Sequence, residues 1–183
     1  MGSIEIAQLQ RRARMAYEFS RLRRAAVGMV PAIVIVALAT CFTHRPMSAV
    51  VFGSVAVALG VFMLWFGREP QKAVLPGIAA GIVPLVLAFC ANYVHSCGMH
   101  GCSSWCVPAC ALGGVVAGLT VASFGNQRQA GPVFWLSASG LALLVGAMGC
   151  SCVGYSGVLG LGLGFAAGTV PGLLRRLAAK KAP

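Results

Sequence analysis

Charged side chains are scarce in this chain, and acidic ones are nearly missing. Charged residues make up 9% of the 183 residues, and the only acids are Glu5, Glu18 and Glu69. Soluble domains average about 25% charged residues, so this composition excludes an ordinary soluble domain. The sequence also shows no phosphate-cradling loop, no Ser/His/Asp set and no pair of catalytic acids. We therefore expect a protein that is not an enzyme.

The residues that are present are mostly apolar and fall into long stretches. The sequence is 58% hydrophobic, with a mean hydropathy of +0.86. Uncharged apolar stretches of about 20 residues are typical of membrane-spanning helices. The pattern predicts an all-α fold, a polytopic membrane bundle of six transmembrane helices at about 25–43, 49–67, 73–94, 107–125, 132–150 and 158–174. None of these ranges contains a charged residue or a histidine, which argues against an ion-coupled pump.

Positive charge is sorted to one side of these predicted spans. Thirteen of the fourteen Lys and Arg residues lie in the two terminal segments or in the loops at 68–72 and 126–131, and only Arg45 lies opposite. Because Lys and Arg concentrate in short cytoplasmic loops, the sequence predicts an inner-membrane protein with both termini in the cytoplasm. The net charge of +11 fits contact with the anionic lipid bilayer, and we expect no direct contact with nucleic acid.

This sorting divides the chain into three parts. A basic N-terminal segment covers 1–24, the transmembrane domain covers 25–174, and a basic tail covers 175–183. The hydrophobic spans take up most of the length, so no separate soluble domain is expected. The composition is compatible with an oligomer.

Cysteine and histidine are sorted to the opposite side. The predicted outer loop at 95–106 and the residues after it contain His95, Cys97, His100, Cys102, Cys106 and Cys110. Cys150 and Cys152, in the second outer loop, could approach this group, and Cys41 and Cys90 lie about one helical turn inside the outer surface. The pattern fits three interpretations: disulfides, a metal site and thiol redox chemistry.

Disulfides are the simplest interpretation, because thiols that face an oxidising compartment persist as bridges. The chain has eight cysteines, an even number, as a closed disulfide framework requires. A metal site is the second interpretation, since thiolate and imidazole ligands suit zinc or copper(I). Its candidate ligands are His95, Cys97, His100, Cys102, Cys106 and Cys110, although their spacing is not that of a standard zinc finger.

Thiol redox chemistry, either exchange or sensing, is the third interpretation. It requires a thiol of lowered pKa beside a second, resolving cysteine. Pro108 is expected in the first turn of the span at 107–125, which places Cys110 near a helix N-terminus, where the helix dipole favours a thiolate. His95 or His100, when protonated, could act in the same direction. No C-x-x-C occurs, which argues against thioredoxin-like exchange.

Small residues four apart predict close packing between helices. The pairs are Gly77/Gly81, Gly114/Gly118 and Gly164/Gly168. The pattern G-x-A-A-G-x-V-P occurs at both 77–84 and 164–171. A 3+3 inverted repeat would explain this, and transporters often have that architecture. Pro84 and Pro171, the last residues of the two copies, are expected to kink their helices.

The N-terminal segment is expected to form a helix that continues into the first span. Met15, Phe19 and Leu22 fall at i, i+4 and i+7, on one face of such a helix. This face is interpreted either as an anchor on anionic lipid or as a docking surface for a cytoplasmic partner.

A short cytoplasmic leader, six short spans and cysteines that face outward resemble the small six-span membrane anti-sigma regulators. That resemblance implies that the leader holds a sigma factor at the membrane while outer thiols sense stress or metal. The chain is also similar to six-span thiol-reductant transporters, in which the first and fourth spans each carry a cysteine, as Cys41 and Cys110 do here.

The expected function is therefore that of a membrane sensor or regulator, with the thiol/imidazole group as input and the N-terminal segment as output. One alternative is a small transporter of soft metal ions or thiol-reducing equivalents. The other is a structural membrane protein with disulfide-stapled outer loops.

Overall fold

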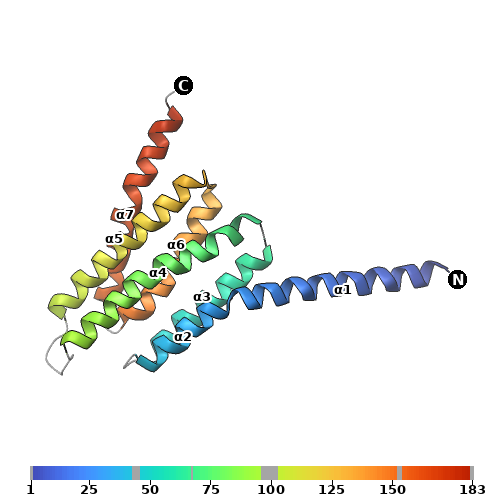
Figure 1. The fold of residues 1–183 in the computed structure, drawn as a ribbon, viewed down its shortest axis with the longest axis horizontal. Coiled ribbons are helices and arrows are strands. Elements are labelled where there is room, and N and C mark those ends of the chain that lie inside the picture. The colour runs from blue at the N-terminus through green and yellow to red at the C-terminus, as the bar shows by residue number, and fades with distance from the viewer. Residues whose placement is uncertain (1, 43–45, 67, 96–102, 152–153, 182–183) are drawn as a thin grey trace.

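The computed structural model describes residues 2–42, 46–66, 68–95, 103–151 and 154–181. Within these ranges the fold is all helical, as predicted, and no strand occurs (Figure 1). The helices are α1 (Gly2–Gly28), α2 (Val30–Phe42), α3 (Pro46–Phe66), α4 (Arg68–His95), α5 (Ser103–Gln127), α6 (Pro132–Cys150) and α7 (Tyr155–Lys181).

Five helices are long and apolar enough to cross a membrane. Their spanning parts are Met47–Trp65, Pro70–Ala91, Cys106–Gln127, Pro132–Cys150 and Tyr155–Leu174. A rise of about 1.5 Å per residue makes a helix of α6's length about 28 Å long, close to the hydrocarbon thickness of about 30 Å. The protein therefore has the character of a multi-pass membrane protein.

A sixth span requires α1 and α2 together. The 13 residues of α2 extend over only about 20 Å, too short to cross a bilayer alone. The segments Gln10–Gly28 and Val30–Cys41 are long and apolar enough to cross a membrane only when they are taken together, with a bend of 42° between them. The stretch predicted at 25–43 thus corresponds to the last residues of α1 followed by α2.

The bend has a local cause. Backbone hydrogen bonds continue on both sides of the bend. The Met29 amide donates to the Ala25 carbonyl at 3.1 Å, and the Ile33 amide donates to the Met29 carbonyl at 3.0 Å. Pro31, however, offers no N–H to the carbonyl of Val27, and its ring crowds that carbonyl, which bends the chain between α1 and α2. As a result α1 leaves the bundle as a projecting arm (Figure 1).

The helices pack through the glycine pairs, as the sequence predicts. On α5, a Cβ at Gly118 would meet the Phe165 carbonyl oxygen of α7 at 2.5 Å. From the α7 side, a Cβ at Gly164 would overlap the carbonyl oxygen of Ala111. On α4, a Cβ at Gly81 would meet the Cβ of Val145 in α6 at 2.6 Å. The backbones of α5 and α7, and those of α4 and α6, therefore approach as closely as glycine allows.

The two copies of the repeated motif face helices that do not correspond. Gly77 and Gly81 of α4 pack on α6, whereas Gly164 and Gly168 of α7 pack on α5. In a 3+3 inverted repeat, the counterpart of the α7–α5 pair would be α4 with the first span. Among the described residues, α2 instead packs on α3 and touches α6 and α1. The repeat thus gains no support from the packing.

Pro84 and Pro171 have different surroundings, although α4 and α7 continue as helices through both. Pro84 is fully buried, and its ring and backbone fill the space beside Gly113 of α5 and Gly146 of α6. Pro171 is exposed. In the core, Pro84 acts as a packing residue between three helices.

Some predicted boundaries differ from the observed ones. The helix α6 covers the predicted range 132–150. The helix α5, however, begins at Ser103, so Pro108 lies inside it and not in its first turn as predicted. The helix α7 continues to Lys181, which makes the predicted tail mostly a helical extension. In both cases polar residues extend a helix beyond its hydrophobic stretch.

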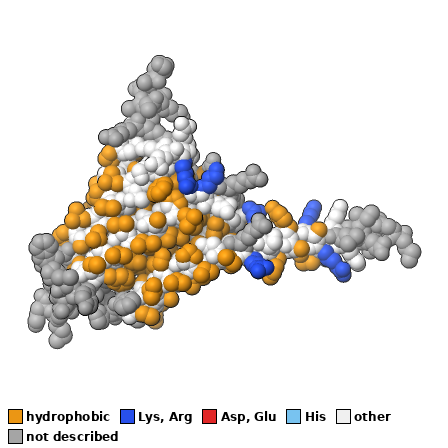
Figure 2. Space-filling view, in the orientation of Figure 1, with side chains coloured by type: hydrophobic (Ala, Val, Ile, Leu, Met, Phe, Trp, Pro, Cys, Tyr) orange, Lys and Arg blue, Asp and Glu red, His pale blue; other side chains and the backbone are white. Residues whose placement is uncertain are grey.

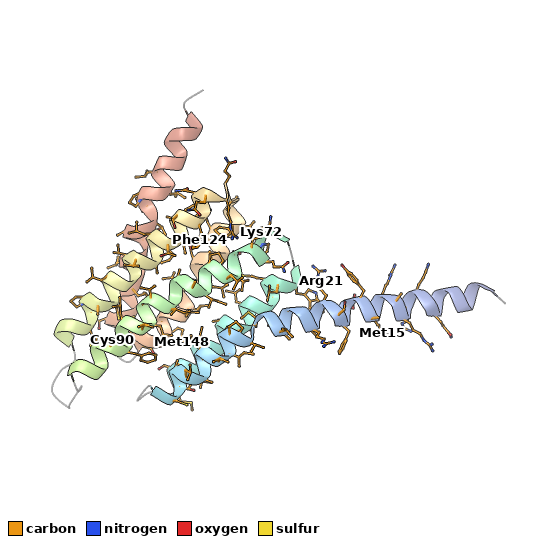
Figure 3. All side chains as sticks on the ribbon, viewed as in Figure 1. Met15, Arg21, Lys72, Cys90, Phe124 and Met148 are labelled. Carbon is orange, nitrogen blue, oxygen red and sulfur yellow. The ribbon has the colours of Figure 1, made fainter. Side chains whose placement is uncertain are left out.

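The bundle has two chemically different ends. We call the end that carries Cys41, Cys90, Cys106, Cys110 and Cys150 the thiol end. The opposite end, from which α1 projects, is the basic end; Lys72, labelled in Figure 3, lies there with its hydrogen-bonded partner Arg128. In Figure 2, hydrophobic side chains cover the bundle between these ends, and the Lys and Arg side chains gather at the basic end and along α1.

Candidate thiol site

Two thiols from different helices meet at the thiol end. Cys110 in α5 and Cys150 in α6 lie side by side in one buried cluster, and neither has exposed surface. Ala88 of α4, Ala147 of α6 and Leu161 of α7 pack around them. The structure therefore brings Cys110 of the first predicted thiol group together with Cys150 from the second.

Cys106 lies one helical turn before Cys110 on the same face of α5. Its side chain is buried too, but 5% of its surface stays exposed, whereas Cys110 has none. Cys106 thus lies between Cys110 and the start of α5 along the helix.

A hydroxyl pair connects this site to α3. The hydroxyl oxygens of Ser48 in α3 and Ser151, the residue after Cys150, lie 3.1 Å apart. Ser151 donates its own hydroxyl hydrogen to the Met148 carbonyl at 3.0 Å, which leaves Ser48 as the donor to Ser151. Ser151 is buried, so this bond fixes the end of α6 against the start of α3.

Two other predicted thiols that the structure describes lie at the surface. Cys41 on α2 and Cys90 on α4 are exposed (Figure 3 labels Cys90). Cys97, His100, Cys102 and Cys152 lie outside the residues that the structure describes. His95 ends α4, but its side chain is also outside the described part.

Within the described part of the chain, neither a disulfide nor a metal cluster is formed. Cys41, Cys90, Cys106, Cys110 and Cys150 are all in the thiol form. No three His, Cys or acidic side chains converge there as metal ligands. Four of the six predicted ligands, His95, Cys97, His100 and Cys102, have no described side chain, so the zinc or copper(I) site stays a prediction.

The prediction that Cys110 lies near the N-terminus of its helix, where the helix dipole would act on it, is wrong. Because α5 begins at Ser103, Cys110 lies well beyond the first turn. The dipole acts mainly within the first turn of a helix. The pairing with Cys150, and not the helix terminus, is what distinguishes this thiol.

The face predicted on the N-terminal helix is exposed. Met15, Phe19 and Leu22 on α1 have 58%, 70% and 40% of their surface accessible. In Figure 3 the side chain of Met15 extends from the arm, away from the other helices. The exposure leaves this face accessible to lipid or to a protein.

A regular spacing would have predicted the burial of both thiols. Cys106, Cys110, Gly114 and Gly118 are four residues apart, so they form one stripe on α5, and Gly114 and Gly118 face α7. On α6, Ala138, Ala142, Gly146 and Cys150 form a second stripe, which faces α4. Cys110 and Cys150 therefore each belong to a stripe of small residues that faces the interior. The Ser48–Ser151 bond has no comparable signal in the sequence.

Comparison with known protein families, with curated proteins and with solved structures finds no significant match. The helices, the thiol pair and the projecting arm therefore carry the functional argument.

Proposed function

We propose that the protein is a membrane sensor of oxidants, in which Cys110 and Cys150 are the sensing pair and α1 is the output element. The burial of these two thiols side by side, on different helices, carries this proposal. Contact between two thiols on different helices is the arrangement that oxidation converts into a covalent link.

The chemistry needs an oxidant, and a hydroperoxide fits the site. One cysteine, as its thiolate, attacks a peroxide oxygen, which breaks the O–O bond, releases hydroxide and leaves a sulfenic acid. The second thiol then attacks that sulfur, an S–S bond forms, and the sulfenic oxygen leaves as water. With hydrogen peroxide, two thiols and one peroxide yield one disulfide and two water molecules. The two sulfur atoms together lose two electrons to the peroxide.

Burial selects the kind of oxidant. Cys110 and Cys150 have no exposed surface, so a protein disulfide cannot approach either sulfur without opening the bundle. A molecule as small as hydrogen peroxide needs only a local opening at the start of α5, beside Cys106. The site is therefore proposed to respond to small oxidants and not to thioredoxin-like partners.

A continuous set of contacts leads from the thiols to the arm. Ser151 follows Cys150 and bonds Ser48, at the start of α3. Farther along α3, the side chain of Met29 fills the notch above Gly60. Met29 lies at the bend between α1 and α2 and is 1% exposed. A disulfide that shifts the end of α6 would act on α3, and through α3 on the direction of the arm.

The arm has the surface of a docking helix. Its apolar residues Met15, Phe19 and Leu22 are exposed beside arginines such as Arg14 and Arg21. This pattern fits a partner with an apolar groove flanked by acidic side chains. A sigma factor held at the cytoplasmic side of the inner membrane is the partner that the architecture favours, with both termini of the chain on that side.

The test is to map disulfides after exposure to peroxide. The protein in lipid nanodiscs is treated with hydrogen peroxide, its remaining thiols are alkylated, and its peptides are analysed by mass spectrometry. We expect a Cys110–Cys150 peptide that is missing from Cys150→Ser, whereas Cys90→Ser, which changes an exposed thiol, should keep it. Formation of other bridges while Cys110 and Cys150 remain alkylated would contradict the proposal.

A further inference from the structure

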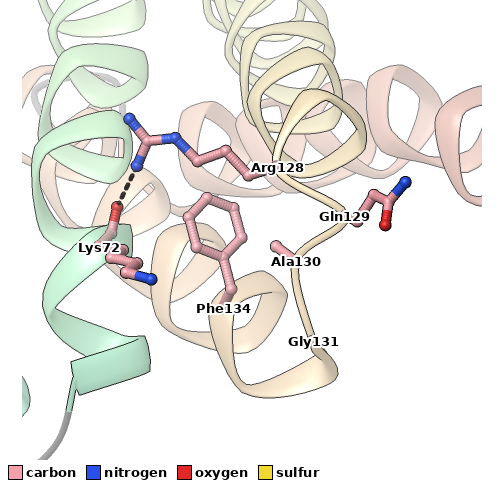
Figure 4. A pocket seen from close by; sticks show the side chains of 6 residues that line it. All are labelled: Lys72, Arg128, Gln129, Ala130, Gly131 and Phe134. Carbon is pink, nitrogen blue, oxygen red and sulfur yellow. Dashed lines mark hydrogen bonds between the residues drawn. The ribbon is translucent and has the colours of Figure 1, made fainter.

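A second site candidate lies at the basic end, far from the thiols in the fold. The start of α4, the loop between α5 and α6, and the first turn of α6 line an open pocket of about 440 Å³ (Figure 4). It is lined by Lys72, Arg128, Gln129, Ala130, Gly131 and Phe134. These residues lie next to the ends of the spans Pro70–Ala91, Cys106–Gln127 and Pro132–Cys150. The cavity is therefore at the depth of the lipid head groups.

Arg128 is fixed in this cavity by a backbone carbonyl. Its Nη1 donates to the Lys72 carbonyl oxygen at 3.2 Å. In a regular helix that carbonyl would accept from the amide of residue 76, which is Pro76 and has no N–H. The proline thus frees an acceptor for the guanidinium to bond. Because a guanidinium has five N–H donors, the others stay available to a ligand.

The cavity is positively charged. Lys72 and Arg128 both line it, and none of its described lining residues is acidic. In Figure 4 the Arg128 guanidinium and the Lys72 side chain lie on the same side of the cavity. The N-cap of α6 is Gly131, which has no side chain to cap the first amides of the helix. The positive end of the α6 dipole therefore adds to the positive potential of the cavity. Two cations of different shape, one of them anchored, are suited to a phosphate group.

We propose that this cavity binds a phosphate group, carried either by an anionic lipid head group or by free phosphate. Arg128 would donate two N–H groups to the phosphate oxygens, and Lys72 would supply a mobile second charge. The volume exceeds what a phosphate ion alone requires, and Phe134 gives the cavity an apolar wall. The site is independent of the thiol pair.

The test compares two probes on the full-length protein. Retention of phosphatidylglycerol against phosphatidylcholine is measured by native mass spectrometry from detergent micelles, and binding of inorganic phosphate is measured by titration calorimetry. Lys72→Gln is the main variant, because it keeps the backbone carbonyl that Arg128 bonds. Arg128→Gln removes the anchored cation. Arg21→Gln is the matched control, since it removes one charge from the exposed surface of α1, outside the cavity.

We expect Lys72→Gln and Arg128→Gln each to weaken binding of the anionic probe about fivefold, and Arg21→Gln to leave it nearly unchanged. Loss confined to phosphatidylglycerol would assign the site to a lipid head group, and loss of inorganic phosphate binding would assign it to a soluble ligand. Equal retention of both probes by Lys72→Gln and Arg21→Gln would overturn the proposal.

Discussion

Single glycine positions decide how closely the helices of this bundle approach. In a bilayer, helix association depends on packing contacts, because lipid is as apolar as the helix surfaces. Gly164 of α7 lies against the Ala111 carbonyl of α5, so even one methyl group there has no space. Gly162, on the same helix two residues earlier, has nothing within 4 Å of an added Cβ. The two positions form a matched pair for testing the packing.

Gly164→Ala should destabilise the bundle by about 1–3 kcal/mol, the range for overpacking a close contact. Gly162→Ala should be neutral or slightly stabilising, because alanine favours the helix. Unfolding of the purified protein in mixed micelles, followed by circular dichroism as the share of denaturing detergent rises, measures both. Equal effects of the two changes would contradict the close α5–α7 contact.

For single residues, the sequence predicted which glycines lie at helix contacts, but it did not predict which thiols meet. The glycine spacing is a local pattern, visible along a single helix. The meeting of Cys110 with Cys150 depends on how α5 and α6 are rotated about their axes, and that rotation is set by contacts with α7 and α4. The same applies to Ser48 and Ser151, which are 103 positions apart in the chain.

The helical elements were largely predictable, and their ends were less so. Hydrophobicity marks where a helix meets lipid, and α6 coincides with its hydrophobic stretch. It does not mark where a helix continues into polar sequence, as α5 does before Cys106 and α7 does after Leu174. Pro31 accounts for the bend of 42° between α1 and α2, but the sequence does not show that Met29, at this bend, packs against Gly60 of α3.

The arm α1 provides a prediction at the level of one element. Replacing Phe19 and Leu22 together by Asp should abolish capture of a cytoplasmic partner, because both side chains belong to its exposed apolar face. Membrane insertion should be unaffected, since the arginines that orient the chain are kept. Tyr17→Asp is the control, because Tyr17 is 67% exposed but points away from that face. The measurement is a pull-down from solubilised membranes, and unchanged capture by the double variant would contradict the output role of α1.

The two ends of the molecule differ in chemistry, with thiols at one end and cationic side chains at the other. The sequence predicts that the basic end faces the cytoplasm, which requires an even number of spans and therefore a bent α1–α2 pair that crosses as one. This arrangement would place the Cys110–Cys150 pair near the outer surface and the phosphate cavity near the inner one.

Reporter fusions test this arrangement. Fusions after Arg24 and after Lys181 should both report the cytoplasm, and a fusion after Ser104 should report the outer side. An external signal after Lys181 would mean an odd number of spans, in which case α1–α2 would not cross the membrane.

The central claim is that oxidation of Cys110 and Cys150 changes the arm at the other end of the molecule. Hydrogen–deuterium exchange of the protein in nanodiscs, before and after treatment with hydrogen peroxide, tests it most directly. We predict that amide exchange changes at the α1–α2 bend around Met29 and in α1 in the wild-type protein, and that it does not change in Cys150→Ser. A Cys110–Cys150 disulfide that forms in full while exchange in α1 stays the same would contradict the claim.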